Sequence, residues 1–220
     1  MKINADLSQR AVVYSADIPW VNSPSPGVQR RMLERNGREV ARATSLVRYA
    51  PATRFDAHTH DIGEEFLVLE GVFSDDTGDF PAGMYVRNPP GSRHQPHSEE
   101  GATIFVKLRQ FDLEDRRFVR IDTRTAEWRP GLVPGLRVMP LHSHAAEQVA
   151  LVRWAPGTHF NRHAHPEGEE IFVLDGVFED EHGRYPEGAW LRNPPDSIHT
   201  PFSNDGCTIY VKTGHLTLPP

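Results

Sequence analysis

The sequence predicts an all-β protein built from two tandem barrels, each a double-sheet jelly roll. Short runs rich in valine, leucine and aromatic residues are separated by Gly, Pro, Asp or Asn along the chain, as in proteins with many short strands. No window combines a helical hydrophobic period with capping residues. Residues 46–107 recur as residues 151–212 without a gap, which indicates that one folding unit has been duplicated.

The order of elements within a repeat follows from its apolar runs and turn residues. Asn36-Gly37 predicts a two-residue hairpin turn, because both residues tolerate positive φ. The charged stretch 112–117 predicts a linker between the repeats. We therefore expect an N-terminal domain at 1–113 and a C-terminal domain at 114–220. The main strands expected in the first repeat are residues 38–49, 65–73, 83–88 and 103–108.

Charge and cysteine content exclude several classes of protein. The chain has 220 residues, a formal net charge of -6 and a single cysteine, Cys207. Its dispersed charge argues against a surface for nucleic acid or anionic lipid. One cysteine allows neither an intrachain disulfide nor a cysteine-based zinc finger. No apolar run approaches the roughly 20 residues that span a bilayer, and no secretory signal is evident. We expect a cytoplasmic protein with no nucleic-acid or membrane partner.

Two copies of a histidine-rich pattern are typical of a metal site. Divalent transition metals readily accept three imidazoles and one carboxylate. Histidines two residues apart on a strand project to one face, and Gly63 and Gly168 allow the bend that returns each glutamate to the same centre. The candidate ligands are His58, His60, Glu64 and His94 in the first repeat, and His163, His165, Glu169 and His199 in the second.

A metal site also predicts neighbours that hold each imidazole through its other ring nitrogen. Other histidines have no place in the repeated pattern: His142, His144 and Glu147 fall where the first repeat has its hairpin, so we expect an exposed turn there. His215 has no counterpart in the first repeat and is expected at the surface, as are His159 and His182. The candidate neighbours are Arg87, Asn88 and Glu65 in the first repeat, and Arg192, Asn193 and Glu170 in the second.

The spacing around the candidate ligands resembles the two motifs of the cupin family. The first motif, G-x5-H-x-H-x(3–4)-E-x6-G, is complete at 157–176, and the first repeat lacks only its leading glycine. The second motif, G-x5-P-x-G-x2-H-x3-N, matches at 83–94 and 188–199, with Asp196 for a glycine and serine for the final asparagine in both repeats. The resemblance implies two tandem cupin double-stranded β-helix (jelly-roll) barrels, a bicupin.

A closer resemblance is to the cupin domain of ChrR-type zinc-containing anti-sigma factors, which carry segments similar to 63–73 and 87–90. It implies a regulatory or sensor protein that holds one divalent metal in each barrel, two per chain, through the eight candidate ligands. Zinc is the metal that the resemblance favours, and iron, manganese and nickel are the alternatives. The N-terminal residues lack the His-x3-Cys-x2-Cys pattern of the anti-sigma module. Direct binding to a sigma factor is therefore not expected.

The residues leave the chemical role open, including whether the protein is an enzyme. With iron(II), an open coordination position would support a dioxygenase acting on a small diketone or phenolic substrate, and other metals would support isomerisation or hydrolysis. A further alternative is that one copy acts and the other is structural. A small molecule is the expected ligand or substrate. Strand edges favour pairing into a homodimer.

Overall fold

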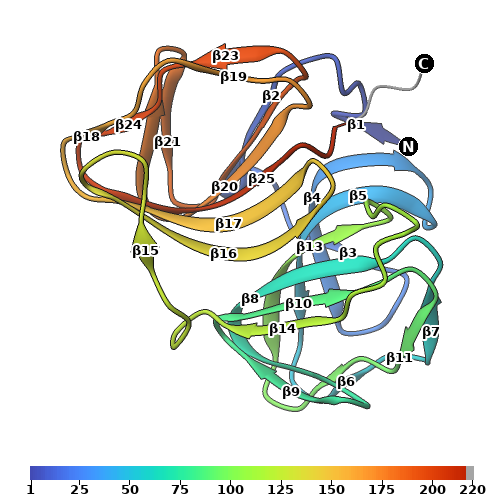
Figure 1. Cartoon of the computed structure of the whole chain (residues 1–220). Coiled ribbons are helices and arrows are strands. Elements are labelled where there is room, and N and C mark those ends of the chain that lie inside the picture. Colours follow the sequence, from blue (N-terminus) through green and yellow to red (C-terminus); the bar gives the residue numbers. More distant parts are fainter. Residues whose placement is uncertain (217–220) are drawn as a thin grey trace. The chain divides into compact units, whose positions relative to one another are not determined.

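The computed structural model describes residues 1–216 and divides into two compact units (Figure 1). One unit comprises Met1–Ala5 and Ile18–Ala126, and is called the first barrel below. The other comprises Asp6–Asp17 and the chain from Glu127 onward, and is called the second barrel. Both are built from antiparallel strands, so the predicted all-β fold of two tandem barrels is confirmed.

Short antiparallel strands form the first barrel. They are β1 (Lys2–Ile3), β3 (Val21–Asn22), β4 (Val28–Gly37), β5 (Ala41–Tyr49), β6 (Thr53–Arg54), β7 (His58–His60), β8 (Glu64–Asp75), β9 (Gly78–Pro81), β10 (Met84–Asn88), β11 (Ser92–His94), β12 (His97–Ser98), β13 (Ala102–Leu108) and β14 (Val119–Asp122). The main sheet runs β1-β4-β5-β13-β8-β10-β14, and β7 pairs with β11 in a separate small sheet.

The second barrel repeats this arrangement. Its elements are β2 (Ala11–Tyr14), the 3-10 turn η1 (Ser15–Asp17), β15 (Arg129–Pro130), β16 (Leu136–His144), β17 (Glu147–Trp154), β18 (Thr158–His159), β19 (His163–His165), β20 (Glu169–Asp180), β21 (Gly183–Pro186), β22 (Ala189–Asn193), β23 (Ser197–His199), β24 (Phe202–Ser203) and β25 (Cys207–Thr213). The main sheet runs β15-β16-β17-β25-β20-β22-β2, and β19 pairs with β23. Within the described residues, no helix is both long and apolar enough to cross a membrane.

Each barrel has its own apolar core, made of side chains from alternate positions of the long strands. Burial of one face fixes the register of a strand, because a slip of one residue would turn every core side chain outward. The register in turn fixes where the histidine-bearing strands begin. Core residues that are at most 1% exposed include Phe66, Val68, Phe73, Val86 and Ile104 in the first barrel and Ile171, Val173, Phe178, Trp190 and Leu191 in the second.

A glycine marks the sharp corner in the long strand of each barrel. Gly71 in β8 has φ +69° and Gly176 in β20 has φ +74°, a region that L side chains rarely adopt. A Cβ atom would lie 2.0 Å from the carbonyl oxygen of Gly101 at the first corner and 2.2 Å from that of Gly206 at the second. No side chain fits at either place, so these strands bend where the glycines stand.

Two strands join the barrel of the opposite repeat. β2 belongs to the first repeat of the sequence, yet it pairs with β22, with Ala11 opposite Arg192. β14 belongs to the second repeat and pairs with β10, with Val119 opposite Arg87. The compact units therefore exchange these strands relative to the division expected from the repeats, 1–113 and 114–220.

The hairpin of β4 and β5 is present, but its turn differs from the expected one. Asn36-Gly37 belongs to β4, and Gly37 pairs with Ala41. The turn is made of residues 38–40, and the Arg35 guanidinium closes it by donating a hydrogen bond to the carbonyl of Arg38 at 2.7 Å. The prediction of a two-residue turn is wrong because this side chain stabilises a longer one.

The charged stretch 112–117, predicted to be a linker between the repeats, is anchored to the first barrel. Asp115 is 1% exposed, and its carboxylate accepts a hydrogen bond from the Arg87 guanidinium at 2.9 Å. Arg87 is itself fully buried and also pairs with Glu65. Arg116 donates to the carbonyl of Pro90 at 3.0 Å. These contacts hold the chain against β10 before it enters β14.

Candidate metal centres

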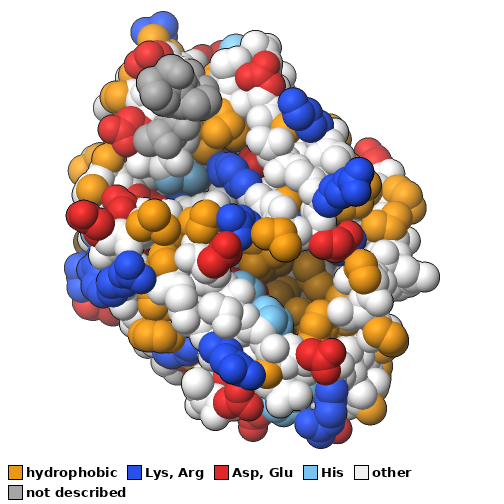
Figure 2. Space-filling view, turned by 90° about the vertical axis from the view of Figure 1, so that its right-hand side faces the viewer, with side chains coloured by type: hydrophobic (Ala, Val, Ile, Leu, Met, Phe, Trp, Pro, Cys, Tyr) orange, Lys and Arg blue, Asp and Glu red, His pale blue; other side chains and the backbone are white. Residues whose placement is uncertain are grey.

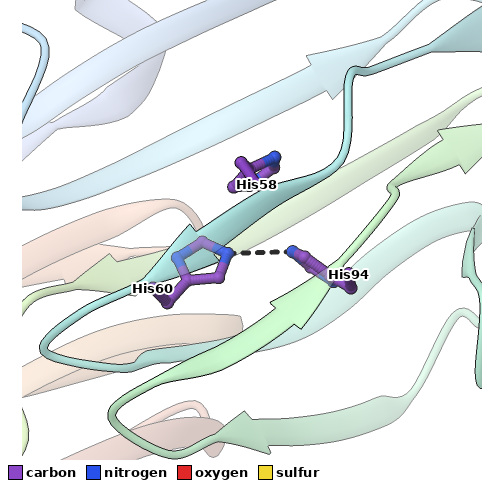
Figure 3. A group of neighbouring side chains, drawn as sticks. All are labelled: His58, His60 and His94. Atoms are coloured by element: carbon purple, nitrogen blue, oxygen red, sulfur yellow. Dashed lines mark hydrogen bonds between the residues drawn. The ribbon is translucent and has the colours of Figure 1, made fainter.

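Three histidines of the first barrel converge across the β7–β11 pair (Figure 3). His58 and His60 share one face of β7 because residues two apart on a strand point to the same side. The antiparallel register places His94 of β11 opposite His58. The Nε2 atoms of His60 and His94 lie 2.8 Å apart. One ligand atom from each of the three histidines falls within 4.8 Å of the others.

Glu64 reaches the same centre from the start of β8. Gly63 has φ +73°, so the chain reverses between β7 and β8 as the sequence predicts. The Oε2 atom of Glu64 lies 3.5 Å from Nε2 of His60 and 3.6 Å from Nε2 of His94. Its carboxylate is buried. The four side chains therefore present three nitrogens and one carboxylate oxygen to one small volume.

The second barrel builds the same group from β19, β23 and β20. His163 lies opposite His199 in the strand pair, and His165 Nε2 is 3.1 Å from His199 Nε2. Glu169 follows Gly168, whose φ is +71°. The carboxylate of Glu169 lies 3.5 Å from His165 Nε2 and 3.6 Å from His199 Nε2. All eight sequence-predicted residues thus fall into two groups of four.

These groups fit a divalent transition metal. Zinc–nitrogen bonds of about 2.0–2.1 Å at tetrahedral angles place ligand nitrogens about 3.3 Å apart, close to the separations found here. Three imidazoles and one carboxylate are ligands that zinc, iron, manganese and nickel all accept. Two histidine-rich groups that could hold metal ions are therefore present. The donor set does not select one of these metals.

Three of the ligand histidines have their Nδ1 atom held by a residue that the sequence prediction missed. Nδ1 of His58 lies 2.9 Å from the carbonyl oxygen of Asp56, and Nδ1 of His94 lies 2.9 Å from the carboxylate of Asp75. In the second barrel, Nδ1 of His163 lies 2.9 Å from the carbonyl oxygen of Asn161. A proton held on Nδ1 leaves the Nε2 lone pair free for the centre. Asp75 has a counterpart at the same spacing in the second repeat, a signal that was available in the sequence.

Two asparagines named as candidate neighbours contact the glutamates rather than the imidazoles. The amide nitrogen of Asn88 donates to Glu64 at 3.1 Å, and that of Asn193 donates to Glu169 at 2.9 Å. Each asparagine is buried at the end of its strand, β10 or β22, directly opposite the glutamate that it contacts. These hydrogen bonds hold the glutamate carboxylates toward the histidines.

The other four candidate neighbours stabilise the fold away from the metal centres. Glu65 faces the opposite side of β8 from Glu64, where it pairs with Arg87 and accepts a hydrogen bond from the Tyr85 hydroxyl at 3.1 Å. Glu170 accepts from the Trp190 indole at 2.9 Å. Arg192 donates to backbone carbonyls that precede β2. Their predicted contact with the imidazoles is not found in the structure.

The two centres differ in the distance between the third histidine, His94 or His199, and the aspartate next to its Nδ1 atom. In the first barrel, Asp75 is within hydrogen-bond distance of His94. In the second, Asp180 is 3.7 Å from Nδ1 of His199, too far for a hydrogen bond. Asp180 instead accepts the Tyr185 hydroxyl at 2.8 Å. The same ligand set is therefore supported differently in the two barrels.

Charge and burial shift the proton affinities of the ligands in opposite directions. Burial lowers the pKa of His60 and of His165, which keeps both imidazoles neutral at neutral pH. Burial also opposes the charged form of His94, but the hydrogen bond that His94 donates to Asp75 and the charge of Glu64 outweigh it and raise the pKa of His94. Burial would raise the pKa of Glu64, yet the neighbouring imidazoles and Asn88 hold it below its usual range.

An apolar cavity of about 170 Å³ reaches the second metal centre. His163, Glu169 and His199 line it together with aromatic side chains that include Trp154 and Phe160. A cavity of roughly 150 Å³ with apolar walls holds one benzene molecule, so there is room here for one ring or a short branched chain. Figure 2 shows one face of the molecule, on which a hollow lined by hydrophobic side chains has histidine at its edge; the cavity of the second barrel is not identified in that view.

The structure departs from two expectations about other polar residues. The exposed turn is present at 145–146, but His142 and Glu147 lie on the strands beside it and are both 8% exposed, and Glu147 pairs with the buried Lys212 at 3.1 Å. His215, expected at the surface, has its side chain buried against Glu170 at 2.7 Å. For Glu147 and His215 a buried group of opposite charge favours the polar side chain inside the protein, and such a partner leaves no local pattern in the sequence.

Comparison with known proteins supports the resemblance found in the sequence. A family model described as the ChrR cupin-like domain matches the chain twice, at residues 8–112 and 116–217. No functionally curated protein matches. The two matched segments follow the repeats, so β2 lies in the first segment and β14 in the second.

Solved structures share the fold at low sequence identity. A candidate dioxygenase from Nostoc punctiforme is 17% identical, with a TM-score of 0.78 over 97% of this chain and 85% of that one. The E. coli protein Ylba is 15% identical, with a TM-score of 0.74 over 98% of this chain and 95% of that one. An oxalate decarboxylase variant of Bacillus subtilis is 16% identical, with a TM-score of 0.60 over 94% and 77%. At these identities the similarity shows the fold alone.

Proposed function

We propose, from the premise that this chain belongs to the ChrR cupin-like domain family, that it binds one divalent metal ion in each barrel and uses these centres to respond to a small molecule. The first ion would be held by His58, His60, Glu64 and His94, and the second by the four equivalent residues. Zinc is the metal that we propose for both. The role is that of a ligand-responsive regulatory protein.

The convergence of the ligands carries this proposal. In both barrels two imidazole Nε2 atoms lie within 3.1 Å of each other and within 3.6 Å of a buried glutamate carboxylate, which also accepts a hydrogen bond from an asparagine. Buried histidines and carboxylates gathered this closely are costly without a positive charge between them. A metal ion would supply that charge, and expansion from four to five ligands would let it bind an oxygen atom of the small molecule.

The surrounding residues limit what such a ligand would be. In the second barrel, Trp154 and Phe160 make an apolar wall beside the metal residues, which favours an uncharged group of about the size of one ring. The ligand that fits therefore has an apolar body and one or two oxygen atoms directed at the centre.

Elemental analysis of the full-length protein, purified without an affinity tag, tests the proposal. We expect about two zinc ions per chain in the wild type. The double variants His58→Ala with His60→Ala and His163→Ala with His165→Ala should each retain one ion. His159→Ala is the matched control, because His159 stacks on Phe202 and takes no part in either centre. A wild-type protein without metal, or a double variant with unchanged metal content, would overturn the assignment.

A second candidate function is that of an iron(II) dioxygenase with a small diketone or phenolic substrate. The apolar cavity next to His163, Glu169 and His199 favours it, since a catalyst needs room for substrate beside the metal. Oxygen consumption after reconstitution with iron(II) separates the two functions. Turnover with acetylacetone or catechol supports the enzyme, whereas two bound zinc ions and no turnover with iron(II) support the regulatory protein.

A homodimer remains part of the proposal, because the exposed edge strands of open sheets are commonly covered by pairing. Analytical ultracentrifugation of the metal-loaded chain tests it. A mass of about twice 24.8 kDa is the expected result.

A further inference from the structure

The exchanged strands bring an arginine to each metal centre. In the first barrel, the guanidinium of Arg120, on β14, donates to Oδ1 of Asn88 at 2.7 Å. In the second barrel, the guanidinium of Arg10, just before β2, donates to Oδ1 of Asn193 at 3.0 Å. Both asparagines use their amide nitrogen to hold the glutamate of the centre. Each centre therefore contains a continuous path of hydrogen bonds from arginine through asparagine to glutamate.

Both arginines come from the opposite repeat of the sequence. Arg10 precedes β2, which lies in the first repeat and pairs in the second barrel. Arg120 lies on β14, in the second repeat, and serves the first barrel. The metal ligands of each barrel come from its own repeat. The arginine behind them comes from the other repeat.

The two arginines reach the same contact from different positions of the repeat. Val119 of β14 and Ala11 of β2 take equivalent places, opposite Arg87 and Arg192. Arg120 is therefore the residue after Val119, whereas Arg10 is the residue before Ala11. The residue in the place of Arg120 on β2 is Val12. Simple copying of one residue during duplication does not produce this pair of contacts.

The contact decides which way the asparagine amide points. An asparagine side chain has an acceptor at one end and a donor at the other, and the two ends are nearly equal in shape. A guanidinium has donors only, so it fixes Oδ1 toward itself and turns Nδ2 toward the glutamate. Without the arginine, the amide is free to present Oδ1 to the carboxylate, and two acceptors in contact repel each other.

The charge of each arginine also balances a local excess of carboxylates. Glu64 and Asp75 of the first barrel both act on Arg120 through their charges, and Arg10 acts on Asp180 in the second. The guanidinium stands behind the asparagine rather than among the ligands. It therefore stabilises the ligand arrangement before a metal arrives.

We propose that each metal centre is completed by a positioning arginine from the opposite repeat, Arg120 for the first barrel and Arg10 for the second, which holds the ligand glutamate through an asparagine. This inference rests on the proposed metal binding. Its specific content is the crossed assignment: a change in one repeat alters metal binding by the ligands of the other.

The test measures metal affinity in full-length proteins that retain one centre. The His163→Ala and His165→Ala background retains the first centre, and the His58→Ala and His60→Ala background retains the second. Into each we would introduce Arg120→Met or Arg10→Met, and then Arg120→Lys or Arg10→Lys. Arg124→Met is the matched control, since Arg124 is exposed and pairs with Asp122. Cobalt(II) titration gives the dissociation constant and the absorption spectrum of each centre, and thermal unfolding with a chelator reports folding.

We expect Arg120→Met to weaken cobalt binding about tenfold or more at the first centre and to leave the second unchanged, since loss of an outer hydrogen-bond partner commonly has this effect. Arg10→Met should do the reverse. The lysine variants, which keep a donor and a charge, should recover most of the affinity and the wild-type spectrum. Unchanged affinities, or loss at the centre of the same repeat, would overturn the inference. A single-centre protein that binds no cobalt before the arginine is changed would instead overturn the proposed function.

Discussion

The two barrels hold the same four ligands in nearly the same geometry, yet they support them differently. In the first barrel, Asp75 lies 2.9 Å from His94, and Phe80 packs nearby. In the second, Asp180 is drawn to the hydroxyl of Tyr185 and stands 3.7 Å from His199. The ligand positions are thus set by strand register, and the strength with which each is held is set by residues behind them. Two centres alike in their ligands are therefore expected to differ in affinity.

The largest expected effect is that of the metal itself on stability. Saturation at about 1,000 times the dissociation constant should stabilise a barrel by about 4 kcal/mol, because only the folded barrel gathers the ligands. Thermal unfolding of the metal-free protein with and without added zinc measures this effect. The single-centre variants should each retain the shift for one barrel only. Equal melting temperatures with and without zinc would contradict the prediction.

The next effect distinguishes the two aspartates. Asp75→Asn should weaken metal binding at the first centre by about tenfold or more, because it removes the negative charge of the group that accepts the hydrogen bond from His94. Asp180→Asn should have a smaller effect on the second centre, where that hydrogen bond is absent. Competition with a chromophoric chelator gives both dissociation constants. Equal losses in the two variants would show that the difference in distance has no energetic consequence.

A smaller effect, on the free energy of unfolding, is expected from replacing Tyr185, whose hydroxyl donates to Asp180 in the second barrel only. Tyr185→Phe introduces the side chain that the first barrel has at this place, Phe80. It removes the hydroxyl that Asp180 accepts at 2.8 Å and should reduce the free energy of unfolding by about 1–2 kcal/mol. Urea denaturation of the metal-free protein measures it, with Phe80→Tyr as the reciprocal control. No loss of stability would mean that another donor replaces the hydroxyl.

The smallest effect concerns pH. The pKa of His94 is raised, so in the metal-free protein its charged form stabilises the fold fully below the unfolded value of about 6.5, and this stability is lost as the pH rises through the folded pKa. Metal binding has the opposite sign, because a protonated imidazole is no ligand. Acidification should therefore release the metal of the first centre as the falling pH protonates His94. Asp75→Asn should move the midpoint to lower pH, and an unmoved midpoint would show that Asp75 does not raise this pKa.

The repeated ligands could be predicted from the sequence because their spacing is local. His58, His60 and Glu64 lie within one strand and one turn, and the strand alternation that brings them together follows from backbone geometry alone. The fold was predictable for the same reason, since the apolar runs and turn residues recur in both repeats. These features need no knowledge of distant contacts.

The supporting residues could not be found in the same way. Arg120 and Arg10 stand at different places in their repeats, and each contacts a residue of the other repeat, so neither a repeat alignment nor a strand pattern identifies them. The burial of Glu147 depends on Lys212, a partner that is distant in the sequence. What escapes prediction here is the choice of partner among distant polar groups, which is decided by packing.

The crossed strands bear on how such a chain arises. A protein with a single repeat, folded in this arrangement, would lack the strand that β2 and β14 supply and would take it from another molecule. Tandem duplication turns that encounter between molecules into one within a chain, where the effective concentration is in the millimolar range. After duplication, a break in the gene between the repeats would separate each ligand set from its arginine. Selection for metal binding would therefore keep the two repeats in one gene.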